Sequence, residues 1–156
     1  MKKKLSISYQ EFSDLGQLPE QDQELVKAAI AATKNSYAPY SRFHVGAAVL
    51  LENGKIISGA NQENAAFPSG LCAERTAMFS ASANYPGVPQ ISIAIAAEFA
   101  RRLVDSPASP CGACRQVMAE YQKIGGKPMS IILYGRKVIR KFEKVDDLLP
   151  FIFDNI

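Results

Sequence analysis

The sequence predicts an α/β protein, a three-layer α-β-α sandwich in which helices cover both faces of a mixed five-stranded sheet. Two observations lead to this class. Two apolar runs rich in β-branched residues flank Asn53-Gly54, which is a strong hairpin signal. After the hairpin, segments with helical patterning alternate with short apolar runs that are typical of strands.

Each expected element has its own local signal. A first helix at 19–34 begins with a proline and carries acids in its first turn. Breaker residues end the two later helices, which are expected at 72–83 and 112–123. The expected strands lie at 43–52, 55–61, 91–97, 130–135 and 137–143, and "VDDLLPFIF" adds a helical turn and an apolar tail. With no repeat or linker in view, residues 1–156 are expected to form one domain.

The composition limits the classes of protein to which this chain can belong. A chain of 156 residues with 47% hydrophobic content can bury a hydrophobic core that needs no disulfide or metal ion to be stable. Its formal charge of +3 is small and spread out, so no nucleic-acid partner is expected. The basic start "MKKK" precedes no apolar run, and no stretch could span a bilayer, so we expect a cytoplasmic protein without a membrane partner. Three cysteines in a reducing compartment favour metal binding or catalysis over disulfides.

The cysteines have a spacing that suits a metal ion. Cys111 and Cys114 are separated by two small residues, which let the backbone turn tightly around one ion. Cys72 opens a second predicted helix, so two helix N-termini would direct their positive ends at the thiolates. Three buried core thiols are the alternative. With zinc, three protein ligands leave the fourth tetrahedral position to water, as in catalytic sites. His44 as a fourth ligand would instead make a closed, structural site.

Charged residues beside the cysteines also have candidate roles. Glu74 follows Cys72 by two residues and could take a proton from a metal-bound water, although an acid in a first turn also complements the helix dipole. Arg75 could donate hydrogen bonds to sulfur and offset the charge of three thiolates. Arg115 could do the same, or form a surface ion pair.

Three blocks in order, "YAPYSRFHVGAAVL", "GANQENAAFPSGLCAERTA" and "SPCGACRQVM", resemble the cytidine deaminases of pyrimidine salvage, in their small homotetrameric branch with three cysteine ligands. The likeness runs from about residue 36 to 117. It implies one zinc ion per subunit, a nucleoside substrate and a homotetramer.

The resemblance gives each site residue a role, with Cys72, Cys111 and Cys114 as zinc ligands, Glu74 as proton shuttle, Asn61 and Glu63 on the ribose 3′-hydroxyl, Phe43 against the pyrimidine, and the Ala73 backbone at the polar edge of the base. Because neighbouring subunits complete each pocket in that family, Ala65, Phe67 and Phe153 are candidates to reach across.

Without the resemblance, several of these positions are ordinary. Asn61 and Glu63 could face the same side of a strand end, yet loop residues of these types are usually solvated. Phe43 and Phe153 would be core anchors. Two residues depart from the family pattern: His44 stands where proline is common, and Gln62 replaces an aliphatic residue. Neither departure touches the predicted metal ligands or the shuttle.

The expected reaction is the hydrolytic deamination of cytidine and 2′-deoxycytidine to uridine and 2′-deoxyuridine, with release of ammonia. A deaminase of a cytosine nucleoside antibiotic such as blasticidin S is an alternative with a similar metal motif. A polynucleotide deaminase is disfavoured, because Cys-Ala-Glu replaces the usual His-x-Glu and the charge is modest. A non-catalytic zinc module, with the basic segment "GRKVIRKFEK" as its contact face, is the alternative from another class.

Overall fold

One twisted sheet organises the chain in the computed structural model, which describes residues 1–155. The strand order is β1-β7-β6-β4-β2-β3, with β5 paired to β4 alone. Among the strand pairs of these residues, β4–β6 is parallel and the others are antiparallel, so the sheet is mixed, as predicted. The strands are β1 (Gln10–Phe12), β2 (Phe43–Leu51), β3 (Ile56–Ala60), β4 (Gln90–Phe99), β5 (Arg102–Leu103), β6 (Ser130–Tyr134) and β7 (Ile139–Phe142).

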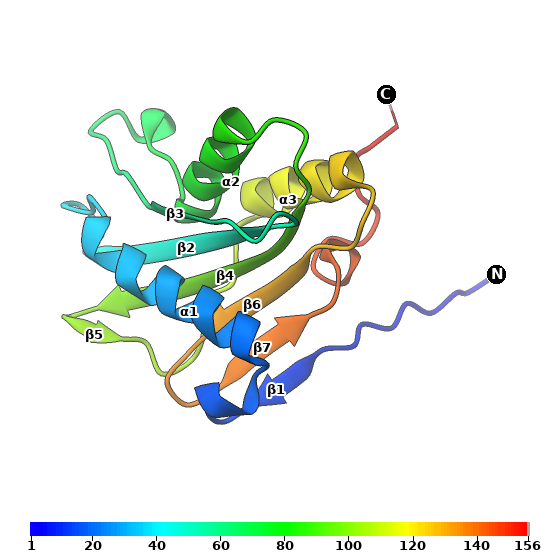
Figure 1. The fold of residues 1–156 in the computed structure, drawn as a ribbon, viewed down its shortest axis with the longest axis horizontal. Coiled ribbons are helices and arrows are strands. Elements are labelled where there is room, and N and C mark those ends of the chain that lie inside the picture. The colour runs from blue at the N-terminus through cyan, green and yellow to red at the C-terminus, as the bar shows by residue number, and fades with distance from the viewer. Residues whose placement is uncertain (156) are drawn as a thin grey trace.

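Helices cover both faces of this sheet (Figure 1). Helix α1 (Glu20–Ala32) packs on one face, and α2 (Ala73–Asn84) and α3 (Gly112–Gly125) pack on the other. The central strand β2 is therefore apolar on both sides, with Ala47 and Val49 toward α2 and α3 and Ala48 and Leu50 toward α1. The predicted three-layer sandwich is confirmed.

The predicted count of five strands is wrong by two. The sheet has seven strands, because β1 and β5 were not expected. These two strands have three and two residues, which is too short for a period-two pattern to stand out. Both depend on a partner already in place, since β1 pairs with β7 and β5 pairs with the end of β4. The five longer strands lie within a few residues of their predicted bounds.

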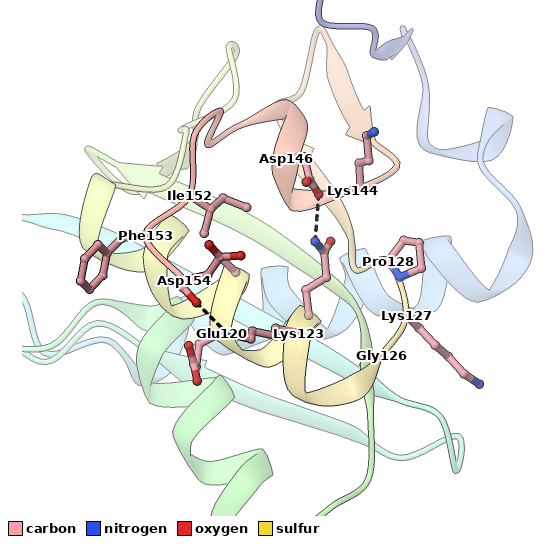
Figure 2. A pocket seen from close by; sticks show the side chains of 12 residues that line it. Glu120, Lys123, Gly126, Lys127, Pro128, Lys144, Asp146, Ile152, Phe153 and Asp154 are labelled. Carbon is pink, nitrogen blue, oxygen red and sulfur yellow. Dashed lines mark hydrogen bonds between the residues drawn. The ribbon is translucent and has the colours of Figure 1, made fainter. Parts of the chain in front are cut away.

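The C-terminal segment lies along α3, beyond the short 3-10 helix Val145–Asp147 (Figure 2). Gln122 of α3 donates to the Asp146 carboxylate at 2.9 Å and accepts hydrogen bonds from the Met129 and Val145 backbone amides. Lys123 donates to the carbonyl of Asp154 at 3.0 Å. These bonds fix the path of the last residues along the helix. None of the helices within residues 1–155 is long and apolar enough to cross a membrane.

Helix α2 approaches β3 so closely that a glycine is required between them. A Cβ on Gly59 would lie 2.5 Å from the backbone nitrogen of Ala77 and 2.9 Å from the carbonyl oxygen of Ala73. Both contacts are to backbone atoms, so the helix could relieve them only by moving as a unit. Gly59 therefore sets how near the start of α2 lies to the sheet.

We expect Gly59→Ala to lower the free energy of unfolding by about 2 to 3 kcal/mol, because the added methyl group overpacks the β3–α2 contact. Chemical denaturation measures the change. Gly112→Ala is the matched control, since its Cβ would meet open space, and it should leave stability unchanged or raise it by up to roughly 1 kcal/mol. Equal stability of the two variants would contradict the assigned role of Gly59.

Candidate metal centre and active site

Two helix N-termini bring the cysteines together. Cys72 is the N-cap residue of α2, and Cys111 is the N-cap residue of α3. Cys114 lies one turn into α3, where its backbone amide donates to the Cys111 sulfur at 3.4 Å. The unpaired amides and positive ends of both helices therefore point toward the sulfur atoms, where they stabilise thiolate charge.

The three sulfur atoms have the spacing of a tetrahedral zinc site. They lie within 4.8 Å of one another, and the sulfurs of Cys72 and Cys111 are 3.8 Å apart. Zinc–sulfur bonds of about 2.3 Å at tetrahedral angles place neighbouring sulfurs about 3.8 Å apart. All three cysteines are free thiols. The donor set therefore fits zinc without rearrangement of the backbone.

The Arg75 side chain lies against one sulfur of this cluster. Its guanidinium donates to the Cys72 sulfur at 3.4 Å. Hydrogen bonds from the Cys114 thiol and from Arg75 lower the pKa of Cys72 to about 5, whereas the pKa of Cys114 is raised because it donates to Cys72. The Cys72 thiolate in turn raises the pKa of Arg75. Without a metal, the negative charge therefore resides on Cys72.

Within residues 1–155, Arg115 makes neither of its two predicted contacts. Its guanidinium donates to the carbonyl of Pro110 at 2.9 Å and to the carbonyl of Leu148 at 2.7 Å. The arginine therefore ties the start of α3 to the C-terminal segment. A sequence window around the cysteines could not show this, because Leu148 lies 33 residues further along the chain.

Glu74 lies in the first turn of α2 and is only 5% exposed. Burial raises the pKa of Glu74 to about 7, and the charge of Cys72 acts in the same direction. A carboxyl group that titrates near neutral pH can both accept and return a proton. The side chain therefore has the protonation behaviour of a general acid and base.

A cavity of about 240 Å³ opens beside the thiols. Its walls come from β2, β4, the residue that follows β3, the loop before α3 and the starts of α2 and α3. It is lined by Phe43, Val45, Asn61, Cys72, Ala73, Glu74, Ile95, Ala108, Ser109 and Cys111. Four predicted substrate or catalytic positions, Phe43, Asn61, Ala73 and Glu74, thus face one space together with two of the thiols.

Asn61 is held by three hydrogen bonds at the rim of this cavity. Its carboxamide oxygen accepts from the backbone amide of Val45 at 2.8 Å and from the hydroxyl of Ser36, and its amide nitrogen donates to the carbonyl of Phe43 at 2.9 Å. One N–H of the carboxamide remains for a ligand. Asn61 thereby fixes the backbone of Phe43 and presents a donor.

A second, wider cavity of about 600 Å³ adjoins the first, because Asn61 and Cys72 line both. Glu63, Phe67 and Arg75 are among its lining residues. Phe67 is 73% exposed and stacks edge-on with Tyr40. Ala65 is exposed and lies outside both cavities. Phe153 is also exposed, on the C-terminal segment beside α3 (Figure 2).

The two departures from the family pattern have separate positions. His44 lies on β2 opposite Glu98 of β4, and the group of metal-ligating atoms within residues 1–155 contains the three thiols without it. The open, three-ligand arrangement therefore fits the geometry. Gln62 bridges Tyr37 and Leu71 through its backbone, and its side chain donates to the carbonyl of Asn35 at 3.2 Å. A polar side chain at this position is thus accommodated by the chain itself.

Ser36 and Ser41 are site residues that sequence reasoning missed. Their hydroxyl groups donate to the side chains of Asn61 and Glu63. The partners lie 25 and 22 residues apart in the chain, so no local pattern could connect them. The available signal was weak: both serines flank the loop that precedes Phe43.

Comparisons with known proteins agree with this geometry. Residues 19–125 match the family model described as the cytidine and deoxycytidylate deaminase zinc-binding region. The chain belongs to the cytidine and deoxycytidylate deaminase family. This deaminase is 52% identical over 99 residues to a cytidine deaminase from Halalkalibacterium halodurans, covering 63% of this chain and 70% of that protein. It is 34% identical over 140 residues to a cytidine deaminase from Mycobacterium tuberculosis, covering 87% of this chain and 92% of that protein.

A solved structure gives the same result for the fold. The deaminase superposes on a crystal structure of cytidine deaminase from Burkholderia pseudomallei with a TM-score of 0.71 and 41% identity, covering 83% of this chain and 97% of that one. The deaminase is therefore an enzyme, and its cofactor is zinc, for which the cluster of three thiols supplies the ligands' chemistry and spacing.

Replacing any one of Cys72, Cys111 or Cys114 with serine should remove most of the zinc, because each substitution deletes one of three thiolate ligands. Metal analysis of the purified variants measures zinc per chain. His44→Ala is the control and should retain one zinc ion, since this side chain lies outside the cluster. Loss of zinc from His44→Ala would indicate a closed, four-ligand site.

Glu74 should contribute stability to the zinc-free deaminase that is lost as the pH rises. Its carboxyl has a pKa of about 7 in the folded state and near 4.5 when unfolded, so between these values the folded state binds more protons. The Glu74 component of the free energy of unfolding therefore falls with rising pH, by roughly 3 kcal/mol from pH 4.5 to 8, while the lowered pKa of Cys72 acts in the opposite direction, in the unaltered protein and in Glu74→Gln alike. Glu74→Gln should lack this component, so the difference between the two chelated proteins, followed by urea unfolding, isolates it. A difference that does not vary with pH would refute the assignment.

Proposed function

We propose that this deaminase hydrolyses cytidine and 2′-deoxycytidine to uridine and 2′-deoxyuridine, releasing ammonia. One observation carries the proposal: the buried Glu74 carboxyl faces the same 240 Å³ cavity as two thiols of the zinc cluster. That juxtaposition is what hydrolytic deamination needs, a metal to activate water and a group to move its protons. The relatives named cytidine deaminase supply the identity of the base.

The walls of the cavity suit a cytosine ring. Phe43, Val45 and Ile95 provide apolar surface against which the base can pack. Ala73 is fully buried at the N-terminus of α2, where the first backbone amides lack helical partners and can meet polar atoms of the base. We assign Phe43 and Ala73 to recognition of the pyrimidine on this basis.

The rim of the cavity suits the sugar. Asn61 retains one N–H that can donate a hydrogen bond to a hydroxyl oxygen. The Glu63 carboxylate can accept a hydrogen bond from the same hydroxyl. Hydrogen bonds, first that from Ser41, lower the pKa of Glu63 and keep it ionised as an acceptor. A donor and an acceptor side by side match the ribose 3′-hydroxyl, which cytidine and 2′-deoxycytidine share.

Glu74 moves the protons of the reaction. When bound, zinc supplies Lewis acidity that lowers the pKa of water toward neutrality. Glu74 accepts a proton as the water oxygen bonds to C4 of cytosine, and it delivers this proton to the ring nitrogen. It then takes the second proton of the same oxygen and delivers it to the amino group. The C4–N bond breaks and ammonia leaves, so water and cytidine are converted to ammonia and uridine. Arg75 donates a hydrogen bond to the Cys72 sulfur. This bond offsets thiolate charge that would otherwise lower the Lewis acidity of the zinc.

The setting of the enzyme follows from the same proposal. We place it in the cytoplasm, where free thiols persist, and in pyrimidine salvage, which consumes these nucleosides.

We propose that residues 1–156 act as one domain and assemble as a homotetramer. Exposed apolar side chains support the assembly, since Phe67, Phe79 and Ile124 are 73%, 42% and 64% exposed. Ala65, Phe67 and Phe153 remain our candidates for completing a neighbour's pocket.

Glu74→Gln should retain one zinc ion per chain while kcat for cytidine falls by about 10³-fold, because the amide cannot relay protons. The loss of absorbance as cytidine becomes uridine gives the rate, with Glu120→Gln, an exposed residue of α3, as the control. Near-normal turnover by Glu74→Gln would refute the mechanism.

The same measurement on the unaltered enzyme tests the substrate. Ammonia release is compared for cytidine, 2′-deoxycytidine and blasticidin S. We expect turnover of the two nucleosides. Turnover of blasticidin S alone would favour the antibiotic deaminase, and a zinc-loaded protein inactive on all three would favour a structural zinc module.

A further inference from the structure

The Glu63 carboxylate is fixed by the tip of a neighbouring loop. One of its oxygens accepts from the backbone amide of Tyr40 at 2.9 Å, and the backbone amide of Ser41 lies 3.3 Å from both oxygens. The Ser41 hydroxyl donates to the other oxygen. Three donors from two consecutive residues therefore determine where this carboxylate points.

The Ser41 hydroxyl also reaches the residue on the base side of the cavity. It accepts a hydrogen bond from the backbone amide of Phe43 at 3.0 Å. A hydroxyl has one proton, and here that proton goes to Glu63 while a lone pair receives the Phe43 amide. A single side chain thus connects the residue at the sugar with the residue at the base.

The loop that carries Ser41 is strained. Arg42, between Ser41 and Phe43, has a φ of 56°, a left-handed conformation that costs a non-glycine residue about 1 kcal/mol. Its amide closes a turn onto the carbonyl of Ala38 at 3.0 Å. The two bonds of the Ser41 hydroxyl offset this strain, and the one from the Phe43 amide spans the strained residue. Loss of the hydroxyl would release the turn and the carboxylate together.

We propose that Ser41 is a positioning residue for nucleoside recognition, whose hydroxyl aims Glu63 at the ribose 3′-hydroxyl. This inference rests on the proposed function. It means that recognition of the 3′-hydroxyl by Glu63 depends on the Ser41 hydroxyl. Ser41 acts through its neighbours. Its contribution should therefore depend on whether the substrate carries the group that Glu63 binds.

The test compares cytidine with 3′-deoxycytidine as substrates for the zinc-loaded enzyme. Ser41→Ala should raise KM for cytidine about tenfold, the effect of losing a hydrogen bond to a charged group, with kcat changed less than about twofold. The same variant should leave kcat/KM for 3′-deoxycytidine unchanged, because the analogue lacks the hydroxyl. A merely structural defect would lower activity on both substrates equally.

Three further variants complete the design. Ser41→Thr keeps a hydroxyl at an exposed position and should restore the KM for cytidine. Ser41→Cys introduces a weaker donor of similar size. It should raise KM for cytidine less than Ser41→Ala does, and it replaces that variant in the test if Ser41→Ala does not fold. Ser130→Ala removes another hydroxyl pair, the 2.7 Å bond from Ser130 to Ser92 within the sheet, and should change neither substrate. Thermal unfolding checks that each variant is folded.

The outcomes are distinct. Loss on cytidine alone supports the proposal. Equal loss on both substrates, or no loss in either Ser41→Ala or Ser41→Cys, overturns it while cytidine turnover by the unaltered enzyme leaves the proposed function intact. Absence of turnover by the unaltered enzyme overturns the proposed function and this inference with it.

Discussion

Two helices must begin within a few ångströms of each other for this molecule to hold a metal. Cys72 precedes α2, while Cys111 and Cys114 begin α3, and all three sulfurs lie within 4.8 Å. The convergence depends on both helices packing on the same face of one sheet. Gly59 allows α2 its close approach, and the Arg115 bonds fix the start of α3. A change in either contact would alter the spacing of the three sulfurs.

Electrostatics follows from this convergence. Thiolates are costly to gather, and here two helix N-termini and the Arg75 guanidinium compensate them. The same helix turn buries Glu74, whose carboxyl then titrates near neutral pH. The start of α2 therefore brings together a thiol, a carboxyl that titrates near neutral pH and a guanidinium. Further along the helix, Ala77, Met78 and Ala81 are fully buried, so the charged groups of α2 occupy only the end that faces the site.

Much of this arrangement was predictable, because the signals are local. The hairpin at Asn53-Gly54, the helix ends and the cysteine spacing each occupy a short window, and the elements they predict are present. What was missed involves partners distant in the sequence. Strands β1 and β5 are short and depend on β7 and β4, and Arg115 bonds to Leu148. The hydroxyls of Ser36 and Ser41 meet side chains more than 20 residues away, which sequence periodicity cannot reveal.

The attachment of α3 to a distant part of the chain has a consequence for synthesis. Cys111 and Cys114 follow Cys72 by about 40 residues, and Arg115 secures the start of α3 through the carbonyl of Leu148, another 33 residues along the chain. A nascent chain therefore presents all three thiols before the contact that anchors the second helix can form. Within a growing polypeptide, the metal-binding geometry is completed only after Leu148 has been synthesised and has folded back onto α3.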